Sequence, residues 1–473
     1  MPFPILAGKA IVDTGFDVAN SCRINDGDDA YMHKTPGSEG DRDKWTFSAW
    51  VKLGRVSGGT QMVLLNGYSS SSNETRIYFS NQRLEFYNYV SDTTSGKGRY
   101  KTDKLFRDPS AWYHIVFTWD SENGTAGNRI RIYVNGTEET SFNVEENPDS
   151  GTDTFIADDV KHWLGRSGTG ENFDGYLAEV CLCDGEAYAA SDFGEFDEDS
   201  PTIWKPKDVS GLTFGTTGFY LDFEDSSNLG NDANGGTDFT EVNLAAADQA
   251  VDSPTNNFCV INPLQAQADD LTFAEGNCKI TNTGNTWRSS YGTFGPSGGK
   301  WYFEIKCQAS SDYERFGIVD ADAMNKQSAD GRYDDTGYNS RGYGYGSDGQ
   351  KTNNGGSPTW GNSWDAGDIL ACAYDLDNGK LYFSKGGTFQ ESGDPTSGGT
   401  GTGSAYDIDT GYFYIPALAH YGSGSSMEFN FGGCSAFTVS SANQDGNGYG
   451  NFEYAVPSGY LALCTKNLGS DGG

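Results

Sequence analysis

The chain has 473 residues, of which 66 are acidic and 32 basic, so its formal charge at pH 7 is −34. A surface this acidic repels nucleic acid and anionic membranes, and we expect neither a nucleic-acid partner nor membrane insertion. Glycine (64 residues) and aromatic residues (14%) are both abundant, which favours short strands and tight turns over long helices or disorder.

The first residues of the chain do not have the pattern of a secretion signal. No basic region precedes the short apolar stretch, which stops at Gly8 and Lys9. The nine cysteines form no disulfide framework and no CxxC pair, so zinc is not expected. Cys181 and Cys183 are spaced to share one face of a strand, which favours buried thiols. We therefore expect assembly in a reducing cytoplasm.

The first half of the chain has the alternation of a β-sandwich. In residues 45–53 every second side chain is apolar, as in a strand with one buried face. Residues 112–119 are apolar on both faces, as expected of a central strand between two layers. Residues 130–134 alternate again and end in Asn135-Gly136, a dipeptide that predicts a type I′ hairpin turn.

Five short motifs in this half resemble those of the laminin-G-like, concanavalin-A-like jelly roll. They are WTFSAWVK (45–52), WYHIVFTWD (112–120), RIYVNG (131–136), LGR (164–166) and FDGYLAEVCLCD (173–184). The resemblance implies a jelly roll of two stacked antiparallel sheets over residues 1–200. It also implies a rim that often binds sugar or calcium, and a structural role for Glu179 in the closing strand.

Calcium binding is an open alternative for the loop that follows residue 120. Asp120 and Asn123 offer oxygen atoms of the kind that a hard cation needs. The competing interpretation, which we prefer, is that both side chains form turns by bonding to nearby backbone groups.

Catalysis is not expected. Glycoside hydrolases with this jelly roll place three acids on one strand, so that alternate carboxylates face the sugar. The nearest pattern is Glu195-Phe-Asp197-Glu-Asp199, which ends in Asp and follows the last strand expected for the sheets. A charge run of this kind is usually solvated, so we expect a protein that is not an enzyme.

Residues 201–258 read as an ordered linker. The segment is rich in Gly, Asn and Asp, and we expect one short strand in it, at residues 219–223. A turn-rich stretch at residues 251–258 marks its end.

The segment 367–387 predicts a β-hairpin. An apolar-rich run ends at Asp375, and after the turn Leu381 and Phe383 alternate with more polar neighbours. Asn378-Gly379 between the two runs predicts a type I′ turn, in which both central residues have positive φ.

Motifs around this hairpin resemble those of a SPRY domain. In chain order they are GKWYFEI, FGIV, YGYGSDGQ, GDILACAYDLDNGKLYFSK, YIPA and MEFNFGG. The resemblance implies a second β-sandwich, over residues 259–473, that binds partners without catalysis. The expected fold class is therefore all-β, with two tandem antiparallel sandwiches joined by the linker.

Long loops of the second sandwich are the expected ligand-binding regions, because loops on a rigid scaffold usually carry binding residues. The candidate side chains are Arg332, Tyr333, Tyr338, Trp360 and Trp364. The alternative for the two tryptophans is that they cover the end of the sandwich, since Trp is usually largely buried.

A jelly roll followed by SPRY in an acidic chain is similar to virion proteins of tailed phages, especially marine ones, as is the closing PSGYLALCTKNL (457–468). This resemblance implies a non-enzymatic fibre, spike or capsid appendage, assembled in the host cytoplasm. Its partners would be other virion proteins and a host-surface glycan or protein. Two alternatives are a capsid decoration or cement protein without a glycan ligand and, less favoured, a polysaccharide hydrolase. The sequence leaves homo-oligomer formation open, since it has no heptad or collagen-like stalk.

Overall fold

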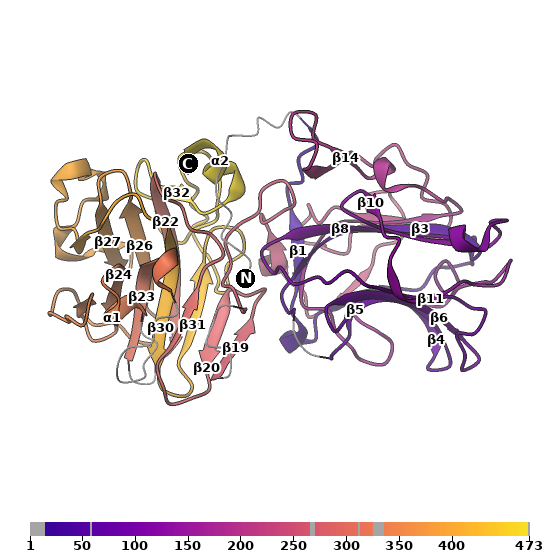
Figure 1. The fold of residues 1–473 in the computed structure, drawn as a ribbon, viewed down its shortest axis with the longest axis horizontal. Helices are drawn as coiled ribbons and strands as arrows, with labels where there is room; N and C mark the ends of the chain where they lie inside the picture. Colours follow the sequence, from indigo (N-terminus) through magenta and orange to yellow (C-terminus); the bar gives the residue numbers. More distant parts are fainter. Residues whose placement is uncertain (1–14, 57–58, 265–269, 311–312, 325–334, 472–473) are drawn as a thin grey trace. The chain divides into compact units, whose positions relative to one another are not determined.

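The structure is a computed structural model in which two compact units are described, Thr14–Thr255 and a unit that includes Asn256–Gly473. Each unit is a β-sandwich built on two main sheets, so the expected all-β class with tandem sandwiches is confirmed (Figure 1). No helix in the described part of the chain is long and apolar enough to cross a bilayer. The residues described are 15–56, 59–264, 270–310, 313–324 and 335–471.

The first unit consists of two eight-stranded sheets, here called sheet A and sheet B. Sheet A has the order β10-β9-β8-β3-β13-β1-β18, with β16 paired to β13; the strands are β1 (Ser21–Ile24), β3 (Lys44–Leu53), β8 (Trp112–Asp120), β9 (Ile130–Val134), β10 (Thr137–Glu138), β13 (Gly175–Asp184), β16 (Phe219–Leu221) and β18 (Gln249–Ala250). Sheet B has the order β11-β7-β6-β5-β4-β12-β2-β17; the strands are β2 (Tyr31–Lys34), β4 (Met62–Ser70), β5 (Asn73–Ser80), β6 (Arg83–Val90), β7 (Arg99–Thr102), β11 (Phe142–Glu146), β12 (Lys161–Leu164) and β17 (Thr240–Val242).

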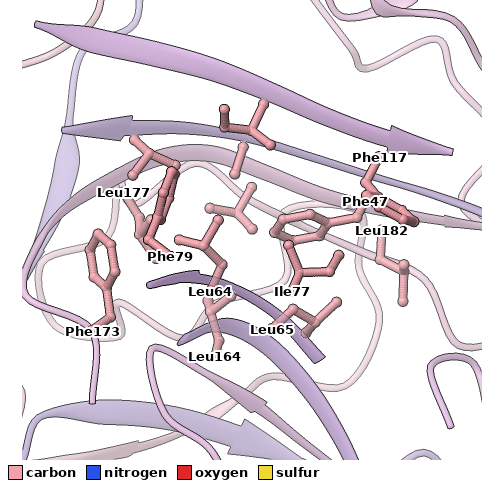
Figure 2. Close-up of a cluster of buried hydrophobic side chains, with 14 of the residues drawn as sticks. Phe47, Leu64, Leu65, Ile77, Phe79, Phe117, Leu164, Phe173, Leu177 and Leu182 are labelled. Carbon is pink, nitrogen blue, oxygen red and sulfur yellow. The ribbon is translucent and has the colours of Figure 1, made fainter. Parts of the chain in front are cut away.

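The apolar positions of alternating strands meet between these two sheets. Figure 1 shows β3 and β8 of sheet A in one layer and β4, β5 and β6 of sheet B in the facing layer. Phe47 and Phe117 from sheet A pack with Leu64 and Ile77 from sheet B, and all four are buried (Figure 2). Burying each such side chain stabilises the fold by about 1.5–3 kcal/mol. These side chains are part of the main hydrophobic core of the first unit.

The hairpin predicted at Asn135-Gly136 is confirmed. Asn135 has φ 48° and Gly136 has φ 74°, as a type I′ turn requires. Val134 pairs directly with Thr137, so two residues connect β9 to β10.

The segment expected to be a linker, residues 201–258, is instead mostly part of the first unit. It supplies β16 to sheet A beside β13, β17 to sheet B beside β2, and β18 to sheet A beside β1. The remaining strand of the region, β15 (Trp204–Pro206), forms a two-stranded sheet with β14 (Gly194–Phe196), which precedes the region. The polar sequence folds here because its charged groups find buried partners, as in the 3.6 Å pair of Lys34 and Asp232. The first unit thus extends to residue 255 rather than 200.

The cysteines of the chain are all buried free thiols. Cys181 and Cys183 lie on the same face of β13, in a small apolar cluster outside the main core. Burial raises the pKa of Cys183 to about 12, which keeps this thiol protonated and unreactive at neutral pH.

The second unit pairs a nine-stranded sheet with a five-stranded sheet. The larger has the order β19-β20-β31-β22-β26-β27-β28, with β29 on β27 and β32 on β22; the strands are β19 (Leu271–Ala274), β20 (Lys279–Asn282), β22 (Lys300–Ala309), β26 (Ile369–Asp375), β27 (Lys380–Lys385), β28 (Thr388–Phe389), β29 (Tyr406–Asp407), β31 (Ser426–Asn430) and β32 (Leu461–Ala462). The smaller has the order β21-β30-β23-β24-β25; the strands are β21 (Arg288–Tyr291), β23 (Tyr313–Asp320), β24 (Gly342–Gly346), β25 (Lys351–Thr352) and β30 (Tyr414–Tyr421). Two short helices, α1 (Asp335–Tyr338) and α2 (Thr465–Asp471), complete the unit.

The hairpin of β26 and β27 forms as predicted, but the type I′ turn is wrong. Asp375 pairs with Lys380, so four residues form the loop, and of these only Gly379 has positive φ (64°). The reason is the Asp375 side chain, which accepts hydrogen bonds from the backbone N–H groups of Asp377 and Asn378 at 3.1 and 2.9 Å. This carboxylate stabilises a longer turn than the Asn-Gly pair alone would form.

Candidate functional site

The outward face of sheet B carries a continuous row of polar and aromatic side chains. Neighbouring strands place His33, Trp163, Asn66, Arg76 and Tyr87 directly opposite one another, from β2 across β12, β4 and β5 to β6. Residues that pair in this way point to the same face of a sheet. The row arises because successive side chains of a strand point to opposite faces, so that Met32, Leu164 and Ile77 lie in the core while the residues of the row face outward.

One end of the row is an aromatic group formed by Tyr31, His33 and Trp163. The ring centroid of Trp163 lies 5.3 Å from that of Tyr31 and 5.5 Å from that of His33. All three side chains are half-buried, so part of each ring reaches solvent. Burial, with a smaller contribution from Lys161, lowers the pKa of His33, which keeps the imidazole neutral at pH 7.

Two cations flank the aromatic group. The Arg166 guanidinium lies 4.8 Å from the centroid of Tyr31 and also bonds to Asp29, Nη1 to Oδ1, at 2.6 Å. The Lys161 ammonium lies 4.9 Å from the Trp163 ring and has no ion pair in the part of the chain that the structure describes. The Trp163 indole N–H is buried and also has no hydrogen-bond partner there. The aromatic group thus offers a ligand partly exposed rings and one cation that has no ion pair among the described residues.

The middle of the row is a closed polar group. Arg76 and Glu74 form a buried ion pair at 2.9 Å, Nη2 to Oε2. The Asn66 amide donates to the same carboxylate at 3.0 Å, and the Tyr87 hydroxyl donates to its other oxygen at 2.7 Å. Because every oxygen of Glu74 is engaged, this carboxylate serves structure rather than proton transfer.

The loop at residues 167–171 covers this polar group. The Gly168 N–H donates to Asn66 at 2.8 Å, and the Thr169 hydroxyl accepts from Arg76 at 2.9 Å. A Cβ atom at Gly168 would lie 2.3 Å from the Tyr68 ring, so only glycine lets the loop approach the sheet this closely. The aromatic group therefore remains the accessible part of the row.

The face holds a second carboxylate, Glu85 on β6, and it too is paired. The Lys101 ammonium lies 2.5 Å from Oε1, and the Tyr78 hydroxyl donates to Oε2 at 2.9 Å. Neither Glu85 nor Glu74 is a free acid or base on this face.

The ligand-binding residues predicted in the second sandwich are only partly assembled. Arg332 and Tyr333 lie outside the described residues. Tyr338 ends α1 and is 41% exposed. Trp360 is half-buried and Trp364 is 3% exposed, and both pack against Tyr345 in the core. The two tryptophans therefore lie together and cover the sandwich core. This is the alternative to ligand binding that the sequence left open for them.

Asp120 and Asn123, the candidate calcium ligands, lie in the turn after β8. The Asn123 side-chain oxygen accepts the backbone N–H of Thr125 at 3.0 Å, and the Asn123 amide lies 3.5 Å from Asp120 Oδ2. This is the hydrogen bonding of a turn formed by Asn. Among the residues that the structure describes, no three His, Cys, Asp or Glu side chains are grouped to hold a metal ion.

The acids of the hydrolase alternative lie away from both main sheets. Glu195 is on β14 of the two-stranded sheet, and its side chain is exposed. Asp197 accepts backbone N–H bonds from Asp199 and Ser200 at 3.0 and 2.8 Å. The pattern is therefore that of a stabilised turn.

Sequence reasoning missed the face of sheet B. One signal was present, because NETRIYFS (73–80) alternates Glu74, Arg76 and Tyr78 with residues of the core face. YMHK (31–34) and KHWL (161–164) alternate in the same way. Short strands of this kind reveal a site only when their neighbours in the sheet are known.

Comparison with protein families assigns both sandwiches. Residues 26–190 match the concanavalin A-like lectin/glucanases superfamily, and residues 300–433 match the SPRY domain family. A comparison with curated proteins finds no match.

Solved structures similar to this chain include the SPRY domain of human HERC1 and a Bacteroides ovatus protein proposed to bind carbohydrate. The HERC1 domain is 16% identical, with 38% of this chain and 99% of that chain covered and a TM-score of 0.29. The Bacteroides ovatus protein is 18% identical, with 48% of this chain and 58% of that chain covered and a TM-score of 0.33. On the two family matches, the chain combines a concanavalin A-like sandwich with a SPRY sandwich, domains of the carbohydrate- or protein-binding kind.

Proposed function

We propose that the chain is a non-enzymatic structural protein of a tailed-phage virion, a fibre, spike or capsid appendage, that attaches the particle to a host-surface glycan. The glycan binds at the aromatic group of sheet B. The SPRY sandwich contacts a protein, and the chain is assembled with other virion proteins in the host cytoplasm. The virion part of this proposal is supported by the order of the two domains, the acidic composition and the closing sequence motif.

The observation that carries the glycan part is the geometry of Tyr31, His33 and Trp163. Their partly exposed rings lie within 6.1 Å of one another and form an apolar surface on which the C–H face of a sugar ring stacks. The Lys161 ammonium, which has no ion pair in the described chain, supplies hydrogen bonds to sugar oxygens. Aromatic stacking beside a few polar groups is the usual composition of a ligand site.

A binding role is favoured over hydrolysis because the two carboxylates described above on the outward face of sheet B, Glu74 and Glu85, are both paired with cations. A glycosidase needs one carboxylic acid to protonate the leaving oxygen and a second carboxylate as base or nucleophile. Glu74 is held by Arg76, and Glu85 is held by Lys101. Glu195 of the alternative triad lies on a separate two-stranded sheet, and Asp197 and Asp199 follow its strand β14.

A glycan array probed with the full chain tests the proposal. We expect binding to a defined set of glycans, loss of that binding in Trp163→Ala, and retention in Tyr313→Ala, which removes an exposed ring of the second unit. Trp163→Phe keeps a smaller stacking ring and should bind with reduced affinity. Binding that is indifferent to Trp163→Ala, in protein that melts normally, would place the glycan elsewhere.

Turnover and location distinguish the alternatives. Release of reducing ends from host polysaccharide, abolished by Glu195→Gln, would establish the hydrolase instead. Absence of any glycan binding, with stoichiometric occupancy on purified capsids, would establish a cement protein. Low-resolution imaging of particles with and without the chain shows whether it belongs to the virion at all.

A further inference from the structure

A polar hollow of about 370 Å³ opens at one end of the second sandwich. It lies where β22 and β24 end, where β26 begins and where β27 ends. Its lining is almost entirely polar and consists of Ser310, Ser347, Asp348, Ser363, Trp364, Asp365, Asp368 and Lys385. A hollow of this composition is suited to a polar ligand rather than to an apolar one.

The charge of the hollow is negative because only one of its three carboxylates is neutralised. Lys385 Nζ lies 2.9 Å from Asp368 Oδ2, so these two form an ion pair. Asp348 uses Oδ1 to accept the N–H of Gln350 at 3.0 Å, and Asp365 uses Oδ1 to accept the N–H of Ala366 at 2.8 Å. No cation pairs with Asp348 or Asp365 among the described residues, so each has a free carboxylate oxygen.

A second observation points to a ligand. Trp364 lines the hollow and is 97% buried, yet its indole N–H has no hydrogen-bond partner among the described residues. A buried donor left without an acceptor is unfavourable, and an acceptor from a bound molecule would satisfy it. The ring itself packs on Phe316 and Tyr345, so it presents no face for a sugar to stack on.

We propose that this hollow binds an arginine side chain of a protein partner. The guanidinium pairs with the free carboxylate oxygens of Asp348 and Asp365, and the Trp364 N–H donates to a carbonyl oxygen of the partner's backbone. A guanidinium fits because its planar fork of N–H donors can bond two carboxylates at once. The proposal is independent of the glycan site, since the two lie in different units.

The test is to titrate the full chain with N-acetylarginine amide. Calorimetry measures the affinity, and the ¹⁵N–¹H NMR signal of the Trp364 indole reports whether the ligand binds in the hollow. N-acetylcitrulline amide, which has the same shape without the charge, is the control ligand. We expect arginine binding to shift the Trp364 signal, to weaken with added salt and to exceed citrulline binding by about tenfold or more. Trp364→Phe identifies the indole signal.

Two variants and a matched control complete the design. Asp348→Asn and Asp365→Asn keep a side-chain oxygen for the turn but remove the charge, and each should weaken arginine binding by about tenfold. Asp409→Asn, an exposed carboxylate near the other end of β27, should bind as the parent chain does. The proposal is overturned if arginine and citrulline bind equally, if neither binds, or if the two variants bind like Asp409→Asn while melting normally.

Discussion

Lys52 and Asp252 form a fully buried ion pair, with Nζ 2.6 Å from Oδ2 and each side chain 1% exposed, although 200 positions separate them. The Trp112 indole N–H donates to the second oxygen of Asp252 at 3.0 Å. Lys52 is on the outward face of β3, so the pair fastens the segment after β18 to sheet A. Breaking such a pair leaves one charge buried alone, which costs more than the pair contributes when intact.

We therefore expect Lys52→Met to lower the free energy of unfolding of the first unit by about 3–5 kcal/mol. Chemical denaturation of the full chain, followed by fluorescence, measures the change. Lys207→Met, on an exposed lysine, is the control and should change stability by about 0.5 kcal/mol or less. The double variant Lys52→Met/Asp252→Leu should recover part of the loss; a Lys52→Met chain as stable as Lys207→Met would contradict the assigned role.

The same anchoring predicts how shortened chains behave. A chain of residues 1–255 should unfold cooperatively, whereas one of residues 1–200 lacks β16, β17 and β18. Without them, Lys34 loses Asp232 and Lys52 loses Asp252. We expect the shorter chain to retain strand content by far-UV circular dichroism but to bind a hydrophobic dye and melt without a sharp transition. A sharp transition in residues 1–200 would restore the linker interpretation.

The fold class follows from the sequence where the signal is local. Period-two alternation in residues 45–53 and the Asn135-Gly136 turn are properties of a few neighbouring residues, and both appear in the structure. The prediction of a type I′ turn at Asn378-Gly379 was wrong because Asp375, outside the dipeptide, accepts hydrogen bonds from the loop backbone. The prediction of a linker at residues 201–258 was wrong for a related reason. Polar residues of this segment pair with Lys34 on β2 and Lys52 on β3, and no local pattern reveals these distant partners.

The candidate site was harder to predict than the fold, because it depends on the order of strands in sheet B. His33, Trp163 and Asn66 are distant in sequence and become neighbours only when β12 pairs with β2 on one side and β4 on the other. Each strand alone looks like an ordinary half-exposed strand. The predicted loop tryptophans had the opposite problem, since Trp364 sits in a loop yet is buried by Phe316 and Tyr345.

Glu179 should make the stability of the first unit dependent on pH. It lies at a bulge of β13 with φ 49°, is buried, and its carboxyl accepts from the Tyr220 hydroxyl at 2.6 Å. Burial, with smaller contributions from nearby acidic groups such as Asp222 and Glu224, raises the pKa of Glu179 to about 8. The folded chain thus keeps a proton that the unfolded chain loses above its ordinary pKa near 4.5. The resulting stabilisation is complete below that value and is lost as pH rises through about 8.

Thermal melts between pH 6 and pH 9 measure this effect. Glu179→Gln keeps an oxygen for Tyr220 and has no proton to lose, so the Glu179→Gln chain should lose about 1–3 kcal/mol less stability than the parent over this range. Glu195→Gln, on an exposed carboxylate of β14, should follow the parent curve. Parallel curves for the parent and Glu179→Gln chains would show that Glu179 is not the titrating group.

Gly379, in the loop between β26 and β27, should tolerate no side chain. Its φ is 64°, and a Cβ atom there would lie 2.6 Å from the backbone oxygen of Ile408, which belongs to the segment that pairs with β27. Gly386, at the other end of β27, has a similar φ of 57° but open space around it. Gly386→Ala therefore costs only the left-handed backbone, about 1–2 kcal/mol, whereas Gly379→Ala adds a steric cost of about 1–3 kcal/mol.

Denaturation of the two alanine variants separates these costs. The transition that Lys52→Met leaves unchanged belongs to the second unit, and the two variants should shift that transition by different amounts. The larger shift in Gly379→Ala would show that the loop between β26 and β27 is held by contact with Ile408. Equal shifts would mean that only the left-handed backbone conformation requires glycine at position 379. The segment around Ile408 would then move aside, which removes the steric cost and leaves the same backbone penalty as at Gly386.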